Sequence, residues 1–257
     1  TDPWLGSDDY AYFGSWHMPY EIPANLKNDI IVSEYIFFSH GHPDHLNPDS
    51  LHQFKNNKII LGDHVGKRIF NELKNQGYKV SILKERIWTE LSKNISVMSI
   101  STKIQDTILL IRINKDIFIN LNDAGPNQTR FIKKVIKPYK RKFLLSLSGW
   151  GDADMINFYD HNDQFIEPLA AKKHPVGDYL SLLAKLFSAN YVIPFSSFHE
   201  YQREDSVWAN KYVTPMDAYK NGIHDDINFV EPFALINCDN NDDIKSLKLK
   251  KNKLKIK

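Results

Sequence analysis

The sequence of 257 residues contains a single cysteine, Cys238, and this scarcity excludes several kinds of site. A disulfide within the chain needs two cysteines, and thiolate zinc clusters and iron–sulfur centres also need more than one. The surrounding segment, LINCDNN, is typical of a strand, and no histidine stands near Cys238 to activate its thiol. Cys238 is therefore not expected to be a nucleophile.

Long apolar runs and export signals are missing as well. No stretch approaches the roughly 18 apolar residues that a bilayer-spanning helix requires. The first residues, TDPWLGSDDYAYFGSW, have neither the charged leader nor the apolar centre of a signal peptide, so the two glycosylation sequons are expected to be chance matches. The sequence predicts a cytoplasmic protein without a membrane span.

A strongly basic body is also absent, although the formal net charge is +2. Residues 245–257, KSLKLKKNKLKIK, hold seven lysines and no acid, so removing them from the net charge of +2 leaves −5 for residues 1–244. The basicity belongs to a tail, which is expected to be a solvated or frayed end, and it gives no evidence for nucleic-acid binding. A tail that touches lipid or RNA is the alternative.

Two common catalytic motifs do not occur. The segment Gly62-Asp63-His64-Val65-Gly66-Lys67 is one residue too short for a phosphate-binding loop and lacks the following Ser or Thr. No Gly-x-Ser-x-Gly nucleophile elbow is present either.

What the sequence does contain is an alternation of strand-like and helix-like segments, without repeats or a composition break before the tail. This pattern predicts one α/β domain over residues 1–244, followed by the basic tail 245–257. Asn47 is the expected N-cap of a helix that begins at Pro48, and residues 107–121 are expected to form a hairpin. The polar segments 148–163 and 197–212 are longer than ordinary connections, which is typical of functional loops. Strands are expected near 35–39, 58–62, 78–83, 95–101, 142–148 and 191–197, and helices near 48–55, 66–77, 129–139 and 177–189.

The most specific pattern is FFSHGHPDHLN at residues 37–47, which places three histidines and an aspartate directly after an apolar strand. The strand fixes the backbone, and the loop beyond it allows side chains to converge on one point. Imidazole nitrogens and a carboxylate are ligands for zinc, or for iron and manganese when more carboxylate is present. We therefore predict that His40, His42, Asp44 and His45 bind metal; the alternative is that they are solvent-exposed loop residues without a ligand.

This His-x-His-x-Asp-His segment resembles the signature of the metallo-β-lactamase superfamily. The segments TDPWLGSDDYAYFGSW, YIFFSHGHPDHL and QDTILLIRINKDIFINLNDAGPN are similar to the branch that contains L-ascorbate-6-phosphate lactonase and the lactamase-like domain of CMP-N-acetylneuraminate hydroxylases. The resemblance implies an αββα sandwich with two divalent metal ions, zinc or alternatively iron or manganese, at one edge of the sheets. It also implies metal ligands in the following positions: His40 and His42 in the first site, Asp44 and His45 in the second, Asp123 as the bridging acid, and His199 as the late histidine.

One ligand of the superfamily has no histidine counterpart in this chain. The third histidine of the first site would stand between the cluster and Asp123, where the sequence has Gln105-Asp106-Thr107. Either Asp106 replaces the imidazole, a set that also suits non-haem iron, or Asp106 only caps a strand and the first site is weak. Neighbouring strand residues point to opposite faces, so either Asp106 or Gln105 faces the cluster.

The start of the sequence also departs from the superfamily. The sandwich usually opens with two or three strands before the segment matched by DPWL, so the chain is expected to be N-terminally incomplete. A Rieske domain, which needs two cysteines, is not expected within residues 1–257.

Three functions remain open. The first is a metal-dependent hydrolase of an ester, a lactone or a phosphodiester, in which Asp44 is the catalytic residue that orients water. Its substrate would be small and anionic, with Tyr201, Arg203, His161 and His174 as candidate contacts. The second is the lactamase-like part of an iron-dependent sugar-nucleotide hydroxylase that takes electrons from a separate Rieske-type partner. The third is a non-catalytic binding module that has lost one metal site.

Overall fold

The computed structural model describes residues 1–6, 10–147, 159–167, 175–196, 198–239 and 243–256. The helices are α1 (Ala24–Ile31), α2 (Pro48–Leu51), α3 (Arg68–Asn75), α4 (Thr129–Ile136) and α5 (Val176–Phe187), with short 3-10 turns at His52–Phe54, Val65–Lys67, Val207–Tyr212 and Met216–Ala218. The longer strands are β4 (Tyr35–Phe38), β5 (Lys58–Leu61), β6 (Lys79–Ile82), β8 (Ile95–Ser101), β9 (Thr107–Ile113), β10 (Asp116–Asn122), β11 (Arg141–Ser146) and β12 (Tyr191–Pro194). Strands of two or three residues are β1 (Tyr10–Ala11), β2 (Trp16–His17), β3 (Tyr20–Glu21), β7 (Thr89–Glu90), β13 (Glu200–Tyr201), β14 (Asn228–Phe229), β15 (Ala234–Ile236), β16 (Ile244–Ser246) and β17 (Lys250–Lys251).

The larger sheet has the strand order β14-β12-β11-β10-β9-β8-β7. Its strands β10, β11, β12 and β14 are parallel, whereas β8, β9 and β10 are joined as antiparallel neighbours. The predicted hairpin is confirmed: β9 turns into β10 at Asn114, whose φ of 52° is a left-handed value that asparagine tolerates better than most residues. The apolar run of β9, TILLI, is typical of a strand that is buried on both faces.

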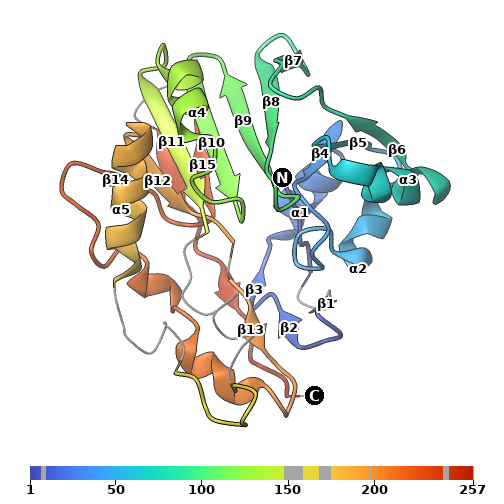
Figure 1. The fold of residues 1–257 in the computed structure, drawn as a ribbon, viewed down its shortest axis with the longest axis vertical. Helices are drawn as coiled ribbons and strands as arrows, with labels where there is room; N and C mark the ends of the chain where they lie inside the picture. The colour runs from blue at the N-terminus through green and yellow to red at the C-terminus, as the bar shows by residue number, and fades with distance from the viewer. Residues whose placement is uncertain (7–9, 148–158, 168–174, 197, 240–242, 257) are drawn as a thin grey trace.

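A smaller parallel sheet, β4-β5-β6, lies beside the larger one (Figure 1). One face of β4 and β5 contributes Phe37 and Ile60, which pack with Val97 and Leu109 of β8 and β9. The two sheets therefore share a core, but only over the β8–β9 side of the large sheet.

Helices cover the two outer faces. Helices α4 and α5 pack on the large sheet through a core that includes Ile119, Leu144 and Val192, and α1, α2 and α3 lie on the small sheet around Phe38 and Ile59 (Figure 1). The order of layers is thus helix, sheet, sheet, helix, which confirms the αββα prediction. Among the described helices, none combines the length and the apolar character that a bilayer-spanning helix needs.

Local capping agrees with the sequence where the cluster leads into α2. The side chain of Asn47 accepts a hydrogen bond from the backbone N–H of Ser50, and Pro48 occupies the first turn. The Asn47 amide also donates to the carbonyls of Tyr10 and Pro43. The loop that carries the histidines is therefore held at its far end by a buried cap.

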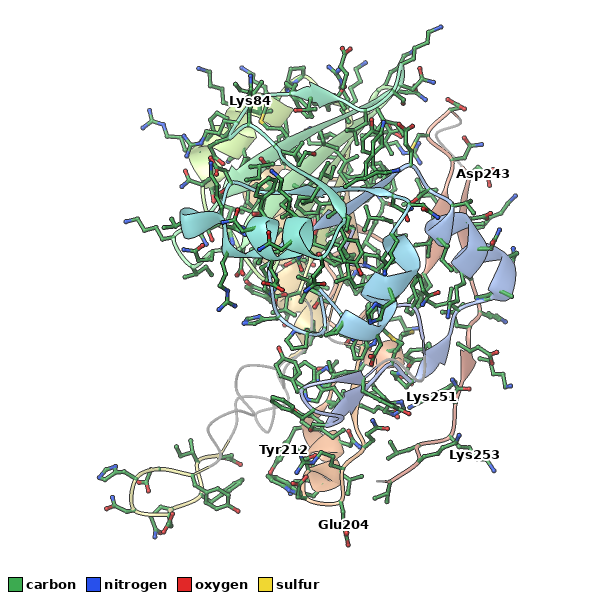
Figure 2. The ribbon with its side chains drawn as sticks, turned by 90° about the vertical axis from the view of Figure 1, so that its right-hand side faces the viewer. Lys84, Glu204, Tyr212, Asp243, Lys251 and Lys253 are labelled. Carbon is green, nitrogen blue, oxygen red and sulfur yellow. The ribbon has the colours of Figure 1, made fainter. Side chains whose placement is uncertain are left out.

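The basic tail was expected to be solvated or frayed; its described lysines are exposed, but two short stretches of it are paired in strands. Strand β16 pairs with β15, and Lys250–Lys251 form β17, which pairs with β3 near the start of the chain. Lys251 also makes an ion pair with Glu200, with a nitrogen–oxygen distance of 2.5 Å. Figure 2 shows the side chains of Lys251 and Lys253 at the surface of this ordered segment.

Candidate metal centre

The ends of several strands meet at one edge of the sheets. Strand β4 ends just before His40, β10 ends just before Asp123, and β12 leads toward His199. Because β10 and β12 run in the same direction and β9 runs against β10, the start of β9, with Asp106 before it, lies at the same edge. Residues that are far apart in the sequence are brought together in this way.

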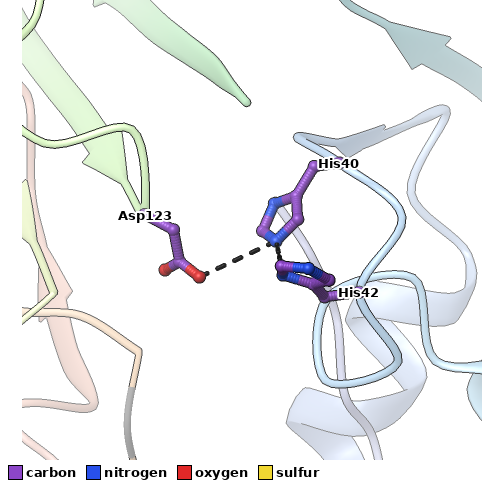
Figure 3. A group of neighbouring side chains, drawn as sticks. All are labelled: His40, His42 and Asp123. Carbon is purple, nitrogen blue, oxygen red and sulfur yellow. Dashed lines mark hydrogen bonds and ion pairs between the residues drawn. The ribbon is translucent and has the colours of Figure 1, made fainter. Parts of the chain in front are cut away.

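The side chains of His40, His42 and Asp123 converge at this edge (Figure 3). Among the described residues, these three form the group whose potential ligand atoms all lie within 4.8 Å of one another. His40 Nε2 is 2.8 Å from His42 Nδ1 and 3.7 Å from Asp123 Oδ2. His40 is buried and His42 is exposed, so the group is open to solvent on the side of His42.

His45 lies beside this group and is surrounded by carboxylates. Its Nε2 is 3.3 Å from Asp123 Oδ2 and 3.4 Å from Asp44 Oδ2, and its Nδ1 is 3.4 Å from Asp2 Oδ2. Neither ring nitrogen has a hydrogen-bond partner of good geometry among the described residues, although both are buried. Burial lowers the pKa of His45, but its contacts with Asp123 and Asp2 outweigh that effect and raise the pKa well above the ordinary value. The site concentrates negative charge around one imidazole.

Asp2 is a site residue that sequence reasoning missed. Its side chain is 3% exposed, and Oδ1 accepts a hydrogen bond from the backbone N–H of Ser39 at 2.7 Å. The Asn122 side chain donates to Oδ2 at 2.5 Å. Asp2 therefore connects the end of β4, the end of β10 and His45. The only signal in the sequence was its place in the DPWL segment, which the resemblance included without giving Asp2 a role.

The direction of Asp123 is set by an irregularity at the end of β10. The pairing of β10 with β11 shifts between Asn120 and Asn122, which is the pattern of a β-bulge. Asn122 has a left-handed φ of 49°, and its backbone N–H donates to the Asn120 side chain. Asparagine accepts this conformation more readily than most residues. The bulge turns the chain so that Asp123 faces His40 and His45.

His199 lines a cavity that adjoins the candidate metal ligands. Its ring stacks on Trp16 with a centroid distance of 3.5 Å, and its Nε2 is buried without a hydrogen-bond partner among the described residues. Burial and the nearby His17 lower the pKa of His199 to about 3. Asp44, His45 and His199 line one cavity, so the predicted late histidine faces the same space as two cluster residues.

Asp106 approaches the opposite edge of the His40 ring. Asp106 Oδ1 is 3.7 Å from His40 Nδ1, whereas His42 and Asp123 face Nε2. Asp106 is 7% exposed, and Gln105 is exposed with a φ of 71°. Of Gln105 and Asp106, it is Asp106 that faces the cluster, from the Nδ1 side of His40 and outside the group formed with His42 and Asp123. That Asp106 replaces the missing imidazole as a metal ligand stays a prediction.

A second layer supports Asp106 and the end of β4. His64 Nε2 is 2.7 Å from Thr107 Oγ1, and His64 also makes a hydrogen bond with the backbone of Ser39. Gly62 passes so close to Thr107 that an added Cβ would lie 2.1 Å from Thr107 Oγ1. This close approach requires glycine at the end of β5.

Asp44 has a partner that the sequence did not indicate. The hydroxyl of Tyr12 donates a hydrogen bond to Asp44 Oδ1 at 2.9 Å, which leaves Oδ2 directed at His45. Burial raises the pKa of Asp44, and burial with the adjacent His45 charge lowers the pKa of His40 to about 4. His40 and His199 are thus neutral at pH 7, the form in which imidazole binds metal.

The four predicted substrate contacts have different locations. Tyr201 is buried and packs edge-on against Trp16 and His199, so it borders the site. Arg203 is exposed and is paired with Asp205. His161 is exposed beside Asn162, with a nitrogen–nitrogen distance of 3.2 Å. His174 lies outside the described residues. Of the three described contacts, only Tyr201 is brought next to the candidate ligands.

The chain is similar in sequence to known proteins over about half of its length. No protein-family model matches it. It is 24% identical over 144 residues to the human protein named inactive cytidine monophosphate-N-acetylneuraminic acid hydroxylase, which is 52% of this chain and 28% of the human one. It is 28% identical over 140 residues to the cytidine monophosphate-N-acetylneuraminic acid hydroxylase of Asterias rubens, which is 51% of this chain and 21% of that protein. The match thus spans about a quarter of each relative.

Solved structures with similar folds include proteins of different activities. CmlA, a diiron β-hydroxylase from Streptomyces venezuelae, has a TM-score of 0.44 at 12% identity, covering 78% of this chain and 40% of that one. A diphosphatase of the PhnP family has a TM-score of 0.43 at 12% identity, covering 80% and 72%. Human tRNase Z, short form, has a TM-score of 0.39 at 15% identity, covering 63% and 71%. The αββα layers, with the His-x-His-x-Asp-His segment at the sheet edge, are those of the metallo-β-lactamase fold, as the sequence predicted.

Proposed function

We propose that this chain carries a two-metal hydrolase site that acts on an ester, a lactone or a phosphodiester. The observation that carries the proposal is a set of buried ligand atoms that have no hydrogen-bond partner among the described residues, namely His45 Nε2, His199 Nε2 and Asp123 Oδ1; His45 and His199 line one cavity, and the Asp123 carboxylate contacts His45. Leaving such atoms unpaired costs about 1–3 kcal/mol each. Bound metal ions would give each of these atoms a partner, so the residues present are suited to hold metal.

In this proposal the two sites divide the ligands. His40 Nε2 and His42 Nδ1, which lie 2.8 Å apart, would hold the first metal, and Asp44, His45 and His199 would hold the second. Asp123, whose Oδ2 contacts both His40 and His45, could serve either. The exposed side of His42 gives solvent access to the first site.

Bound divalent metals would supply Lewis acidity and lower the pKa of water to about 7. Asp44 orients this water in the proposed site. Tyr12 fixes one oxygen of Asp44 by a hydrogen bond and leaves the other directed at His45. Trp16 holds the ring plane of His199 by stacking, which orients its Nε2.

A second candidate is the lactamase-like part of an iron-dependent hydroxylase. The similarity to cytidine monophosphate-N-acetylneuraminic acid hydroxylases favours it, and so does the number of carboxylates near the histidines, since carboxylate ligands suit iron as well as zinc. This candidate requires a separate electron donor, for which a Rieske-type protein is the expected partner.

Elemental analysis followed by an activity assay distinguishes the candidates. We expect two zinc ions per chain in the purified protein, and hydrolysis of p-nitrophenyl acetate or bis-p-nitrophenyl phosphate that a chelator abolishes and added zinc restores. Iron in place of zinc, without hydrolysis, would favour the hydroxylase. A protein that binds no metal would leave the third function, a binding module.

The role of Asp106 leads to a separate prediction. A carboxylate beside the second nitrogen of a metal-bound histidine orients the ring, and losing such a partner typically costs 10–100-fold in metal affinity. Ser39 Oγ, 2.9 Å from His40 Nδ1, is the direct partner of that nitrogen, and Asp106 acts across 3.7 Å through its charge. We therefore expect Asp106→Asn to weaken metal binding at the first site by about 10-fold, the lower end of that range. Gln105→Ala is the control, because its side chain is exposed and adjacent in sequence. Competition with a chromogenic chelator measures both affinities, and an unchanged affinity in Asp106→Asn would leave Asp106 as a strand cap.

A further inference from the structure

A cavity of about 380 Å³ opens from the candidate metal centre along the larger sheet. Its floor includes Phe118, Leu145 and Ile193 of β10, β11 and β12. Leu145 and Ile193 are direct neighbours in the register, and Phe118 points to the same side of the sheet. These residues lie on the face of the large sheet that is turned away from α4 and α5.

The cavity exists because the two sheets have different widths. The small sheet packs against β8 and β9, and its shared core with the large sheet does not include β10–β12. The remaining space is bordered by residues outside the small sheet, which include Trp4, Phe195, Phe198 and Phe233. An apolar hollow is left whose end is formed by Asp44, His45 and His199.

The walls contain apolar and aromatic side chains, and at one end the ionisable side chains of Asp2 and Asp44 contact that of His45. Among the described residues that line the cavity, none is a lysine or an arginine, and the carboxylates are Asp2 and Asp44. Lys251, on the far side of His199, is already paired with Glu200. A phosphate or a nucleotide on the floor of the cavity, away from His45 and the proposed metal site, would find no lysine or arginine there, and burying an unpaired charge is costly.

We propose that this cavity holds the uncharged acyl or aryl body of an ester or lactone whose carbonyl lies beside Asp44, His45 and His199. This inference rests on the hydrolase proposal, and it replaces the small anionic substrate expected from the sequence with a substrate that is apolar beyond its reacting group. A cavity of this size with apolar walls and a few polar groups at one end is typical of small-molecule sites.

Matched esters test the inference in the metal-loaded protein. We expect kcat/KM to rise from p-nitrophenyl acetate to the butyrate by about ten-fold, since each buried methylene contributes about 0.8 kcal/mol. p-Nitrophenyl hexanoate and the mono-p-nitrophenyl ester of adipic acid have the same six-carbon chain, and the adipate ends in a carboxylate. The hexanoate should be preferred by at least about ten-fold, because the cavity would have to desolvate the carboxylate.

A charge introduced into the wall should reverse this preference. Ile193→Lys places an ammonium on the floor of the cavity, and we expect the adipate ester to become the better substrate. Met18→Lys, on a short connecting segment at the cavity wall, provides the same test if the substitution in β12 prevents folding. Leu182→Lys is the control, because Leu182 is 60% exposed on α5.

Binding of the corresponding anilides, measured by titration calorimetry, separates this inference from the hydrolase proposal. Hydrolysis without a chain-length preference, or with a preference for the adipate, would overturn the inference and leave the hydrolase intact. Absence of hydrolysis together with tighter binding of hexananilide than of the adipic monoanilide would overturn the hydrolase and support the apolar cavity. Equal binding of the two anilides would overturn the cavity assignment directly.

Discussion

His42→Ala is expected to remove the metal from the first site while the fold remains intact. His42 Nδ1 is 2.8 Å from His40 Nε2 and belongs to the group that converges with Asp123. The loss of a direct ligand should weaken metal binding by more than about 100-fold, because losing a residue that only hydrogen-bonds to a ligand already weakens it by about 10–100-fold. The His42 side chain is exposed and outside the hydrophobic clusters, so the free energy of unfolding of the metal-free protein should change by less than about 0.5 kcal/mol.

Elemental analysis and urea unfolding of the metal-free protein check the two parts of this expectation. His52→Ala is the matched control, since His52 is an exposed histidine of the neighbouring 3-10 turn. Unchanged metal content in His42→Ala would exclude this residue from the site. A large loss of stability without loss of metal would assign it a structural role instead.

The αββα layers were predictable because the longer strands have clear patterns. Strands β9 and β10 contain the apolar runs ILLI and IFI and are joined by an Asn-Lys-Asp turn, and α2 begins with a cap and a proline. The strands of two or three residues, such as β13 and β17, were not predictable, since a pattern of period two needs more residues to be recognised. The pairing of the lysine-rich tail with β3 was missed for this reason.

The candidate ligands could be recognised in the sequence because they are close together, whereas the residues that position them could not be recognised. His40, His42 and His45 fall within six positions directly after a strand. The contact of Asp2 with His45 spans 43 positions, and only the arrangement of the loops around β4 and β10 brings them together. Tyr12 is an ordinary aromatic residue in the sequence, and its role depends on one hydrogen bond to Asp44.

The apolar cavity was the least predictable part. Phe118, Leu145 and Ile193 are ordinary strand residues, and the sequence gives no sign that their side of the sheet is left without a covering strand. How far one sheet covers the other depends on how the two sheets pack, and the pattern of a single strand does not indicate it. The anionic substrate expected from the sequence followed from the resemblance and the loop residues, and Arg203, one of those residues, is instead paired with Asp205 at the surface.

Asp2→Ala is expected to have the largest effect on stability. The Asp2 carboxylate is buried, faces His45 Nδ1 at 3.4 Å and accepts hydrogen bonds from Ser39 and Asn122. Removing this acceptor leaves the backbone N–H of Ser39 and the Asn122 amide unpaired, which costs about 1–3 kcal/mol for each buried group, while Asp44 and Asp123 still face His45. Metal affinity at the second site should also fall by about 10–100-fold, because Asp2 orients the ring of a proposed ligand. Asp29→Ala is the control, since Asp29 is exposed on α1.

The pH dependence of this loss distinguishes the charge pair from simple packing. Burial raises the pKa of Asp2, but its contacts with His45 outweigh that effect and hold the pKa below the ordinary value, whereas the pKa of His45 is raised. A lowered carboxyl pKa contributes stability that is present above the unfolded value and is lost as the pH falls through the folded one. A raised imidazole pKa contributes stability that is present below the unfolded value and is lost as the pH rises through the folded one. The difference in unfolding free energy between the metal-free protein and Asp2→Ala should therefore be greatest between the unfolded pKa values of the carboxyl and the imidazole, and it should shrink as the pH falls or rises toward the folded values. A difference that does not vary with pH in urea unfolding would mean that Asp2 acts through packing and hydrogen bonds alone.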